Sequence, residues 1–156
     1  MSLRVHLERR ARDVAVDAAA VKRFARDVLS GEGIEDAEVT LVLSDDRSLH
    51  ELNARFRGMD RPTDVLAFPA GETGPAEGGG YLGDVVISVE RARAQAPRFG
   101  NDVDGELARL VAHGLLHLLG YDHHAPADGR RMKAAERRAL ARRRPGALAR
   151  ASRGRA

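Results

Sequence analysis

The chain has 156 residues, of which 43% are hydrophobic and 31% are charged, with no cysteine and a formal net charge of +3. This composition suits one globular domain and excludes a fibre or a disordered chain, and the lack of cysteine excludes disulfides, thiolate metal sites and cysteine nucleophiles, so that any metal must have nitrogen or oxygen ligands. We find no signal-peptide core and no membrane-spanning apolar run, and therefore expect a cytoplasmic protein with no membrane partner.

The first half of the chain alternates strand and helix. Residues 3–7 and the β-branched run at residues 38–43 are predicted strands. Asp17 is a suitable N-cap for a helix that extends to about residue 29, and Asp45, preceded by Ser44, can cap a second helix. The apolar positions of these helices recur at helical spacing: Val21, Phe24, Ala25 and Val28 in the first, and Leu49, Leu52 and Phe56 in the second.

The second half contains two more strands and three helices. The strands are predicted at residues 62–69 and 81–89, separated by a flexible glycine-rich loop at residues 71–80. The helices are predicted from about residue 90, from residue 103 to residue 119, and from Pro126 until Pro145 stops the last one. The pattern predicts an α/β (α+β) domain in which a small mixed sheet packs against a central helix that carries histidines.

Four of the six histidines lie in the sequence HGLLHLLGYDHH at residues 113–124. On a helix, His113 and His117 lie one turn apart on the same face, where both rings can converge on one ion. Gly120 tolerates the left-handed backbone that ends such a helix, and the turn then brings His123 back as a third ligand. Three imidazoles leave one position open to water, as in catalytic zinc sites, so we predict one Zn²⁺ per chain held by His113, His117 and His123.

Two alternatives bear on this motif. The histidines could instead be packing or surface residues of a leucine-rich helix, but the ligand spacing would then have arisen by chance. His124 could also replace its neighbour as the third ligand, although the spacing after the glycine favours His123. The pattern also matches the metzincin protease signature except that Gly114 replaces the Glu that acts as general base. Glu106 lies roughly 10 Å away along the helix at 1.5 Å per residue, too far to replace that base, and we expect it to be a surface or supporting residue.

Three segments together resemble a known family. They are LNARFRGMDRPTDVLAFP at residues 52–69, LGDVVIS at residues 82–88 and the histidine motif, and they are similar in sequence and order to the YbeY family of bacterial rRNA maturation factors. The resemblance covers about residues 38–140. It implies a single zincin-like domain and a single-strand-specific, metal-dependent endoribonuclease that matures the 3′ end of small-subunit rRNA and takes part in ribosome quality control. It also implies RNA, the ribosome and ribosome-associated proteins as partners, with zinc as the metal.

The resemblance also assigns residues. The metal ligands fall on His113, His117 and His123, and the catalytic residues on His113 and Arg57, whose planar guanidinium can grip two phosphate oxygens. Asp64, Asp84 and Asp122 are expected to cap turns or to orient a histidine. The alternatives are a metzincin-like metallopeptidase, which the missing Glu disfavours, and a non-catalytic, metal-stabilised ribosome-binding factor.

The C-terminal end concentrates positive charge. Residues 130–156 hold ten Arg, one Lys and one Glu, a net charge of +10, whereas residues 1–129 hold 15 basic and 22 acidic side chains, a net charge of −7. We predict an endoribonuclease domain at residues 1–144 and a basic tail at residues 145–156, which either contacts RNA phosphates or is a solvated end. Aromatic residues are only 4% of the chain, so we expect phosphate contacts, rather than base stacking, to dominate RNA binding.

Overall fold

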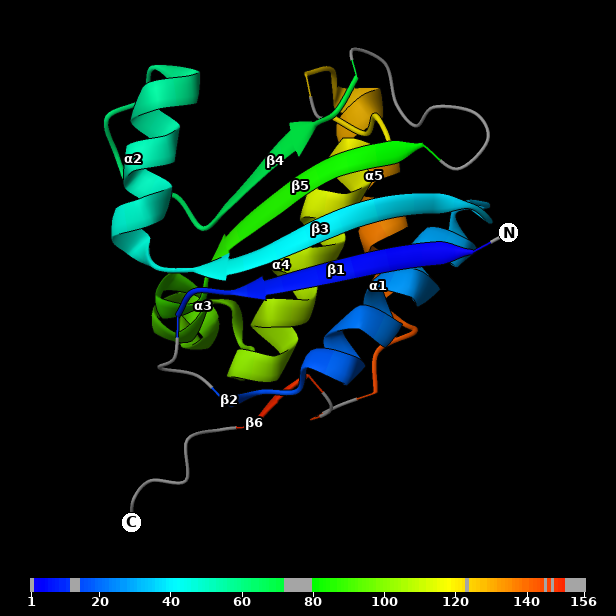
Figure 1. Ribbon diagram of the computed structural model, residues 1–156, viewed down its shortest axis with the longest axis horizontal. Helices are drawn as coiled ribbons and strands as arrows, with labels where there is room; N and C mark the ends of the chain where they lie inside the picture. Colours follow the sequence, from blue (N-terminus) through cyan, green and yellow to red (C-terminus); the bar gives the residue numbers. More distant parts are fainter. Residues whose placement is uncertain are drawn as a thin grey trace.

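The computed structural model describes residues 2–11, 15–71, 80–122, 124–144, 146 and 148–150. Every predicted strand and helix is present, but the last helix ends at Leu140, before the predicted stop at Pro145. Most of the predicted glycine-rich loop, residues 72–79, and Pro145 itself lie outside the described residues. The elements are β1 (Leu3–Arg9), β2 (Ala15–Val16), α1 (Ala18–Gly31), β3 (Ala37–Ser44), α2 (Asp46–Arg57), β4 (Val65–Pro69), β5 (Tyr81–Ser88), α3 (Val89–Gln95), the 3₁₀ helix η1 (Ala96–Phe99), α4 (Val103–Leu118), α5 (Pro126–Leu140) and β6 (Ala149–Arg150) (Figure 1).

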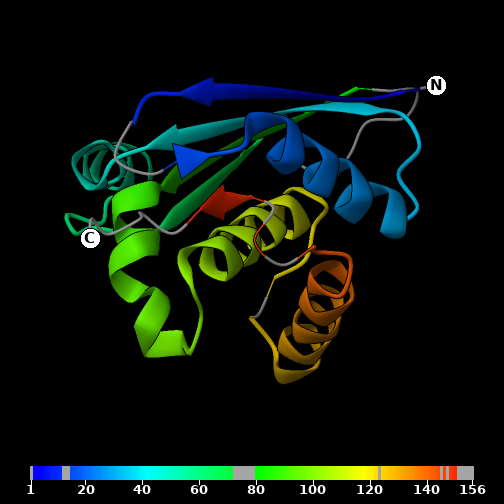
Figure 2. The same cartoon turned by 90° about the horizontal axis from the view of Figure 1, so that it is seen from below.

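The main sheet is small and mixed, as predicted. Its strand order is β1-β3-β5-β4, with β1, β3 and β5 parallel and β4 antiparallel to β5. Because successive residues of a strand point to opposite faces, Leu41 and Leu43 of β3 enter the core shared with α1 and α4, whereas Val42 packs with Leu49 of α2. Figure 2 shows α1, α4 and α5 together on one side of the sheet. Helix α2 packs on the opposite face.

Helix α4 is buried on two sides, which makes it the central element of the fold. Leu107, Val111 and Leu115 pack in the core with the sheet, while Leu116 packs with Met132 and other residues of α5. This leaves one polar stripe of α4 uncovered by apolar side chains, and the histidines lie on it. In the described part of the chain, none of the helices has both the length and the apolar character that a membrane span requires.

The predicted helix caps are confirmed. The side chain of Asp17 accepts a hydrogen bond from the backbone N–H of Ala20 (3.1 Å), and the side chain of Asp45 accepts one from Ser48 (2.8 Å). Each satisfies an N–H that the first turn of a helix leaves without an intrahelical acceptor. The start of each helix is therefore determined locally by its own sequence.

The described residues near the C-terminus dock onto the domain. Strand β6 pairs antiparallel with β2, and Leu148 is buried in the main core. The carboxylate of Asp104 at the start of α4 accepts hydrogen bonds from the backbone N–H groups of Gly146 (3.0 Å), Leu148 (2.5 Å) and Ala149 (3.0 Å). It also pairs with Arg143. The packed domain therefore extends past the predicted start of the tail, and residues 151–156 lie outside the described residues.

Two truncations should separate the docked strand from the end that follows it. A chain cut after Arg144 loses the buried Leu148 and the backbone donors of Asp104, and we expect its free energy of unfolding to fall by about 3 kcal/mol or more. A chain cut after Arg150 keeps these contacts and should unfold like the full chain. Urea denaturation followed by circular dichroism measures both, and equal stability of the two truncated chains would contradict the docking.

Candidate active site

His113 and His117 lie together on the uncovered stripe of α4. Their ring centroids are 4.6 Å apart with an interplanar angle of 67°, and both rings line a cavity of about 460 Å³. The predicted third ligand, His123, lies outside the described residues. Its neighbours Asp122 and His124 line the same cavity, so His124, which the spacing left outside the site, is at its wall.

The end of α4 has the geometry that the sequence predicted. Gly120 has φ +99°, its N–H donates to the carbonyl of His117 (3.0 Å), and the N–H of Tyr121 donates to the carbonyl of Leu116 (3.0 Å). These two bonds define a Schellman motif, in which a left-handed residue reverses the chain at a helix C-terminus. The reversal directs the following residues back towards the two histidines.

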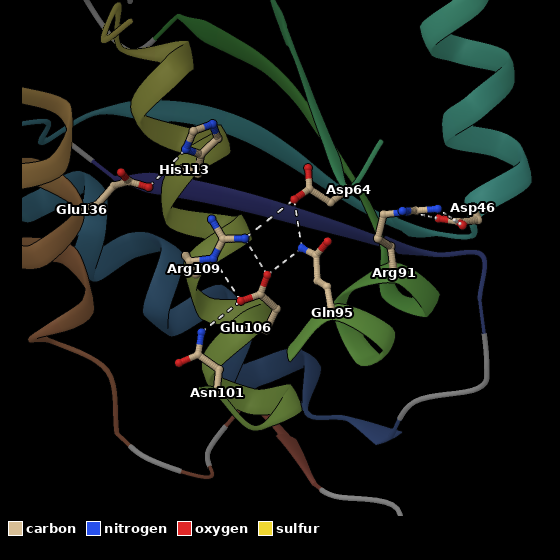
Figure 3. Close-up of polar contacts among 9 residues, drawn as sticks. All are labelled: Asp46, Asp64, Arg91, Gln95, Asn101, Glu106, Arg109, His113 and Glu136. Atoms are coloured by element: carbon tan, nitrogen blue, oxygen red, sulfur yellow. Dashed lines mark hydrogen bonds and ion pairs between the residues drawn. The ribbon is translucent and has the colours of Figure 1, made fainter. Parts of the chain in front are cut away.

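An acidic residue of α5 orients His113. Nδ1 of His113 lies 3.1 Å from Oε2 of Glu136 (Figure 3), so an Nδ1–H donated to this carboxylate leaves Nε2 with its lone pair for a metal. Burial alone would raise the pKa of Glu136, but the hydrogen bond from His113 and the nearby positive charge of Arg109 lower it below its ordinary value. Glu136 therefore stays ionised. The sequence interpretation missed this residue, although it is the one acid in the +10 segment.

Glu106 is not a surface residue, and the expectation that it could be one is corrected here. It is fully buried, and its carboxylate accepts hydrogen bonds from Arg109 (3.0 and 2.6 Å), Gln95 (2.6 Å) and Asn101 (3.0 Å). Burial would raise the pKa of Glu106, but these donors together lower it below its ordinary value. Glu106 therefore neutralises and fixes Arg109, one turn before His113.

The same network holds Asp64 at the wall of the cavity. Oδ2 of Asp64 accepts a hydrogen bond from Gln95 (2.9 Å) and lies 3.7 Å from Nη2 of Arg109 (Figure 3). Asp64 thereby connects the segment before β4 to α3 and α4, and its backbone carbonyl accepts from Ser88 of β5 (2.9 Å). Its contacts are structural, as expected, and they position the cavity wall opposite the histidines.

Asp84 lies away from the cavity. It precedes Val85, which faces α4, so its side chain is on the other face of the sheet. There it accepts a hydrogen bond from the hydroxyl of Tyr81, which also lies 2.6 Å from Oγ1 of Thr40. Of the three aspartates singled out in the sequence, Asp64 and Asp122 line the cavity and Asp84 does not.

The structure explains why glycine occupies position 114. Helix α4 lies so close to β5 here that a Cβ added to Gly114 would be 2.4 Å from Cγ1 of Val85, where real Cβ contacts essentially never fall below 3.0 Å. A larger residue would push the histidine helix away from the sheet. The Glu of the protease signature therefore does not fit at this position of this fold.

Replacing Gly114 by Glu should test this packing directly. We expect a loss of stability of more than about 3 kcal/mol, because overpacking costs about 1–3 kcal/mol and burial of an unpaired carboxylate adds to it. Gly114→Ala should lie between this variant and the wild type, since its methyl group meets Val85 but brings no charge. Chemical denaturation measures both, and a Glu variant as stable as the wild type would show that the helix can move.

Arg57 reaches the same cavity from the other side. It is the last residue of α2, and Gly58 caps the helix with φ +66°. Its Nη2 donates to the carbonyl of Ala67 in β4 (3.5 Å), and both residues line the cavity with the histidines. The structure thus brings together the predicted residues Arg57, His113 and His117.

Both ends of α2 are held in place. At its start, the carboxylate of Asp46 forms a bidentate ion pair with Arg91 of α3 (2.9 and 2.7 Å; Figure 3). At its end, the side chain of buried Asn53 donates to the carbonyl of Arg61 (3.0 Å), and the backbone carbonyl of Asn53 accepts from the N–H of Met59 (3.2 Å). Asn53 thus shapes the turn after Arg57, a role that the sequence interpretation did not assign although the residue lies within the quoted motif.

Comparisons with known proteins identify the family of the chain. The family profile described as "Endoribonuclease YbeY" matches residues 6–144. The "Endoribonuclease YbeY" of Pelotomaculum thermopropionicum is 46% identical over 83% of this chain and 90% of its own length, and that of Desulfitobacterium hafniense is 51% identical over 69% and 72%. The solution structure of TM1509 from Thermotoga maritima superposes with a TM-score of 0.57 and 27% identity, covering 88% of this chain and 86% of that one. By the family profile and its curated relatives, the chain therefore belongs to the YbeY family of endoribonucleases.

Proposed function

We propose that the protein is a metal-dependent endoribonuclease that hydrolyses phosphodiester bonds in single-stranded RNA. The observation that carries this proposal is one cavity lined on one side by His113 and His117 and on the other by Arg57. Imidazoles can hold a metal ion, and a guanidinium can bind two phosphate oxygens. The family to which the chain belongs supplies the class of substrate.

The donor set fits a divalent ion such as zinc. Among the described residues, His, Asp and Glu do not form a group of three suited to a metal, and the predicted set of His113, His117 and His123 needs the residue that lies outside them. Two observations support the set: the two rings lie on one face of α4, and Glu136 accepts at Nδ1 of His113. One Zn²⁺ per chain bound there would supply a Lewis acid and lower the pKa of water.

The residues of the chain bind the phosphate and fix the geometry of the cavity. Arg57 binds the scissile phosphate and stabilises the charge that grows on its oxygens during cleavage. Glu136 holds the ring of His113 in one orientation, and the network of Glu106, Arg109 and Asp64 keeps both walls of the cavity at a fixed separation. The two walls come from α4 and from the α2–β4 segment, so the cavity depends on how these elements pack.

The two alternatives fit the structure less well. A peptidase substrate would pair with the edge strand β4 through backbone hydrogen bonds. Here the carbonyl of Ala67 already accepts from Arg57, and Pro69 has no N–H to donate, so β4 is poorly suited to pair with a peptide. Gly114 also leaves no room for the protease base. A non-catalytic ribosome-binding factor would not need an arginine facing two histidines across a cavity.

The finer assignments are also proposals. Maturation of the 3′ end of small-subunit rRNA in the cytoplasm, a role in ribosome quality control, and contacts with the ribosome and ribosome-associated proteins follow from the family resemblance. The positive segment supports RNA contact only in part, because three of its arginines have acidic partners: Arg131 pairs with Asp128, Arg143 pairs with Asp104, and Arg138 lies 3.4 Å from Glu32. Other basic residues of α5, among them Lys133 and Arg137, are exposed and could meet phosphates.

Cleavage assays on the purified full chain test the proposal. We expect cleavage of a single-stranded RNA, resistance of the same sequence in a duplex, loss of activity when divalent ions are chelated, and recovery on addition of Zn²⁺. A peptide substrate should remain intact under the same conditions. Cleavage that continues at full rate in chelator would contradict a metal-dependent mechanism, and peptide hydrolysis would favour the peptidase.

A further inference from the structure

An exposed aromatic side chain lies next to Arg57. Phe56 is 59% exposed, and the neighbouring Met59 is 44% exposed. The ring of Phe56 packs edge to face against Phe68 of β4, with centroids 5.5 Å apart and an interplanar angle of 72°. Exposure of a phenylalanine to water is unfavourable. The contact with Phe68 fixes the position of the Phe56 ring but leaves the ring exposed. A ring that is held in place and largely exposed can stack on another planar group.

The position of this ring relative to the cavity follows from β4. Ala67 lines the cavity, whereas Phe68, the next residue, packs with the cluster under α2. Consecutive residues of a strand are about 3.8 Å apart and point to opposite faces. Phe56 therefore lies on one side of the β4 edge and the histidines on the other, with Arg57 crossing the edge between them.

The surroundings of Phe56 are positively charged. The guanidinium of Arg55 lies 5.9 Å from the centre of the ring, and Arg57 and Arg61 are exposed on the same helix end and turn. The nearby acids have other partners, since Asp60 lies 2.7 Å from His50 and Glu51 lies 3.4 Å from Arg47. An aromatic ring among arginines is the combination with which proteins bind single-stranded nucleic acid.

We propose that Phe56, supported by Phe68, stacks on one unpaired base of the RNA beside the phosphate that Arg57 binds. This inference rests on the proposed function and names the subsite at which it recognises unpaired RNA. A strand that crosses the β4 edge places its phosphate at Arg57 and the adjoining base on the ring. A base inside a duplex is stacked on its neighbours and has no face to offer, so the subsite selects single strands.

The test compares Phe56→Leu, which keeps the apolar volume, with Phe56→Tyr, which keeps the ring. A single-stranded RNA of about ten nucleotides carrying a fluorophore is the probe, and its anisotropy is measured in chelator so that cleavage does not interfere. Loss of one stacked base corresponds to a loss of affinity of about 5- to 150-fold. We expect this loss for Phe56→Leu and near wild-type affinity for Phe56→Tyr. Phe99 is an equally exposed ring (58%) in η1, and its ring centroid lies 4.8 Å from the guanidinium of Arg109, away from Phe56. Phe99→Leu, which keeps the apolar volume there, is the control for the loss of an exposed ring and should bind RNA normally.

The partner base is identified by removing bases from the RNA one at a time. One abasic position should weaken binding by the wild type as much as Phe56→Leu weakens binding to intact RNA. The same abasic RNA should bind Phe56→Leu no more weakly than intact RNA does. Equal affinity of Phe56→Leu and the wild type would overturn the inference and leave Phe56 as an apolar surface for a protein. Wild-type binding without cleavage would contradict the proposed function and leave the stacking intact, whereas no RNA binding by the wild type would overturn both.

Discussion

Replacing His117 by alanine is expected to abolish metal binding and RNA cleavage together. The wild type should retain one divalent ion per chain after purification, and the variant should retain none, because two remaining imidazoles cannot compete with water as three can. Removing Glu136, which lies at Nδ1 of the His113 ring, should weaken metal affinity by about 10- to 100-fold, as is typical of such supporting groups. Elemental analysis of the purified chains and titration with Zn²⁺ rank the three proteins.

His6 provides the control for this experiment. His6 is an exposed histidine of β1, the sheet edge opposite β4, and it lies 2.5 Å from Glu38. It is therefore far from the cavity, and His6→Ala should keep both metal and activity. Circular dichroism separates loss of the ion from loss of the fold, since His117 is only partly buried and its removal leaves no cavity in the core. One equivalent of metal retained by His117→Ala would exclude this residue as a ligand.

Local sequence signals predicted the elements of the fold. Asp17 and Asp45 cap their helices through side-chain contacts within three residues, and Gly120 ends α4 through its own positive φ. The spacing of His113 and His117 places them on one face of any helix. Each of these features depends on neighbours in the chain, which is why the sequence alone could indicate them.

Features that depend on packing between distant segments were not predictable in this way. Glu106 was expected to be at the surface or to support the site, and only the approach of α3 and the η1 turn to α4 shows that Gln95 and Asn101 bury it with Arg109. Glu136 lies 23 residues from His113, and its role becomes visible only when α5 is placed against α4. The pairing of β2 with β6 joins two-residue strands from opposite ends of the chain, too short to produce an alternating pattern.

The functional significance of Arg57 was predicted from the resemblance, but its position was not. A single arginine in a chain with 26 basic residues carries no signal of its own. The structure places it at the end of α2 because Gly58 and Asn53 terminate the helix there. From that position the side chain crosses the β4 edge into the cavity, a contact made across ten residues of sequence.

Arg57→Glu is expected to abolish RNA cleavage while leaving the metal and the fold in place. Loss of one group that stabilises transition-state charge costs about 10²- to 10³-fold in kcat, and reversal of its charge beside a phosphate should cost more. Arg57 donates to a backbone carbonyl of β4, on the cavity wall opposite His113 and His117, so metal content should stay at one equivalent. A negative charge at the end of α2 should lower stability by only about 0.3–1 kcal/mol, because it is exposed and opposes the helix dipole.

Two further variants show whether the geometry of Arg57 or merely its charge matters. Arg57→Lys keeps the charge but presents one ammonium in place of a fork that binds two oxygens, so we expect activity between those of the wild type and Arg57→Glu. Arg47→Glu makes the same charge reversal in the first turn of α2, where Arg47 is exposed and pairs with Glu51, and it should cleave RNA at the wild-type rate. If Arg47→Glu were as inactive as Arg57→Glu, the effect would come from the overall charge of α2. If Arg57→Glu cleaved RNA normally, the phosphate would have to be held by another cation, and the cavity wall formed by α2 and β4 would have no part in the chemistry.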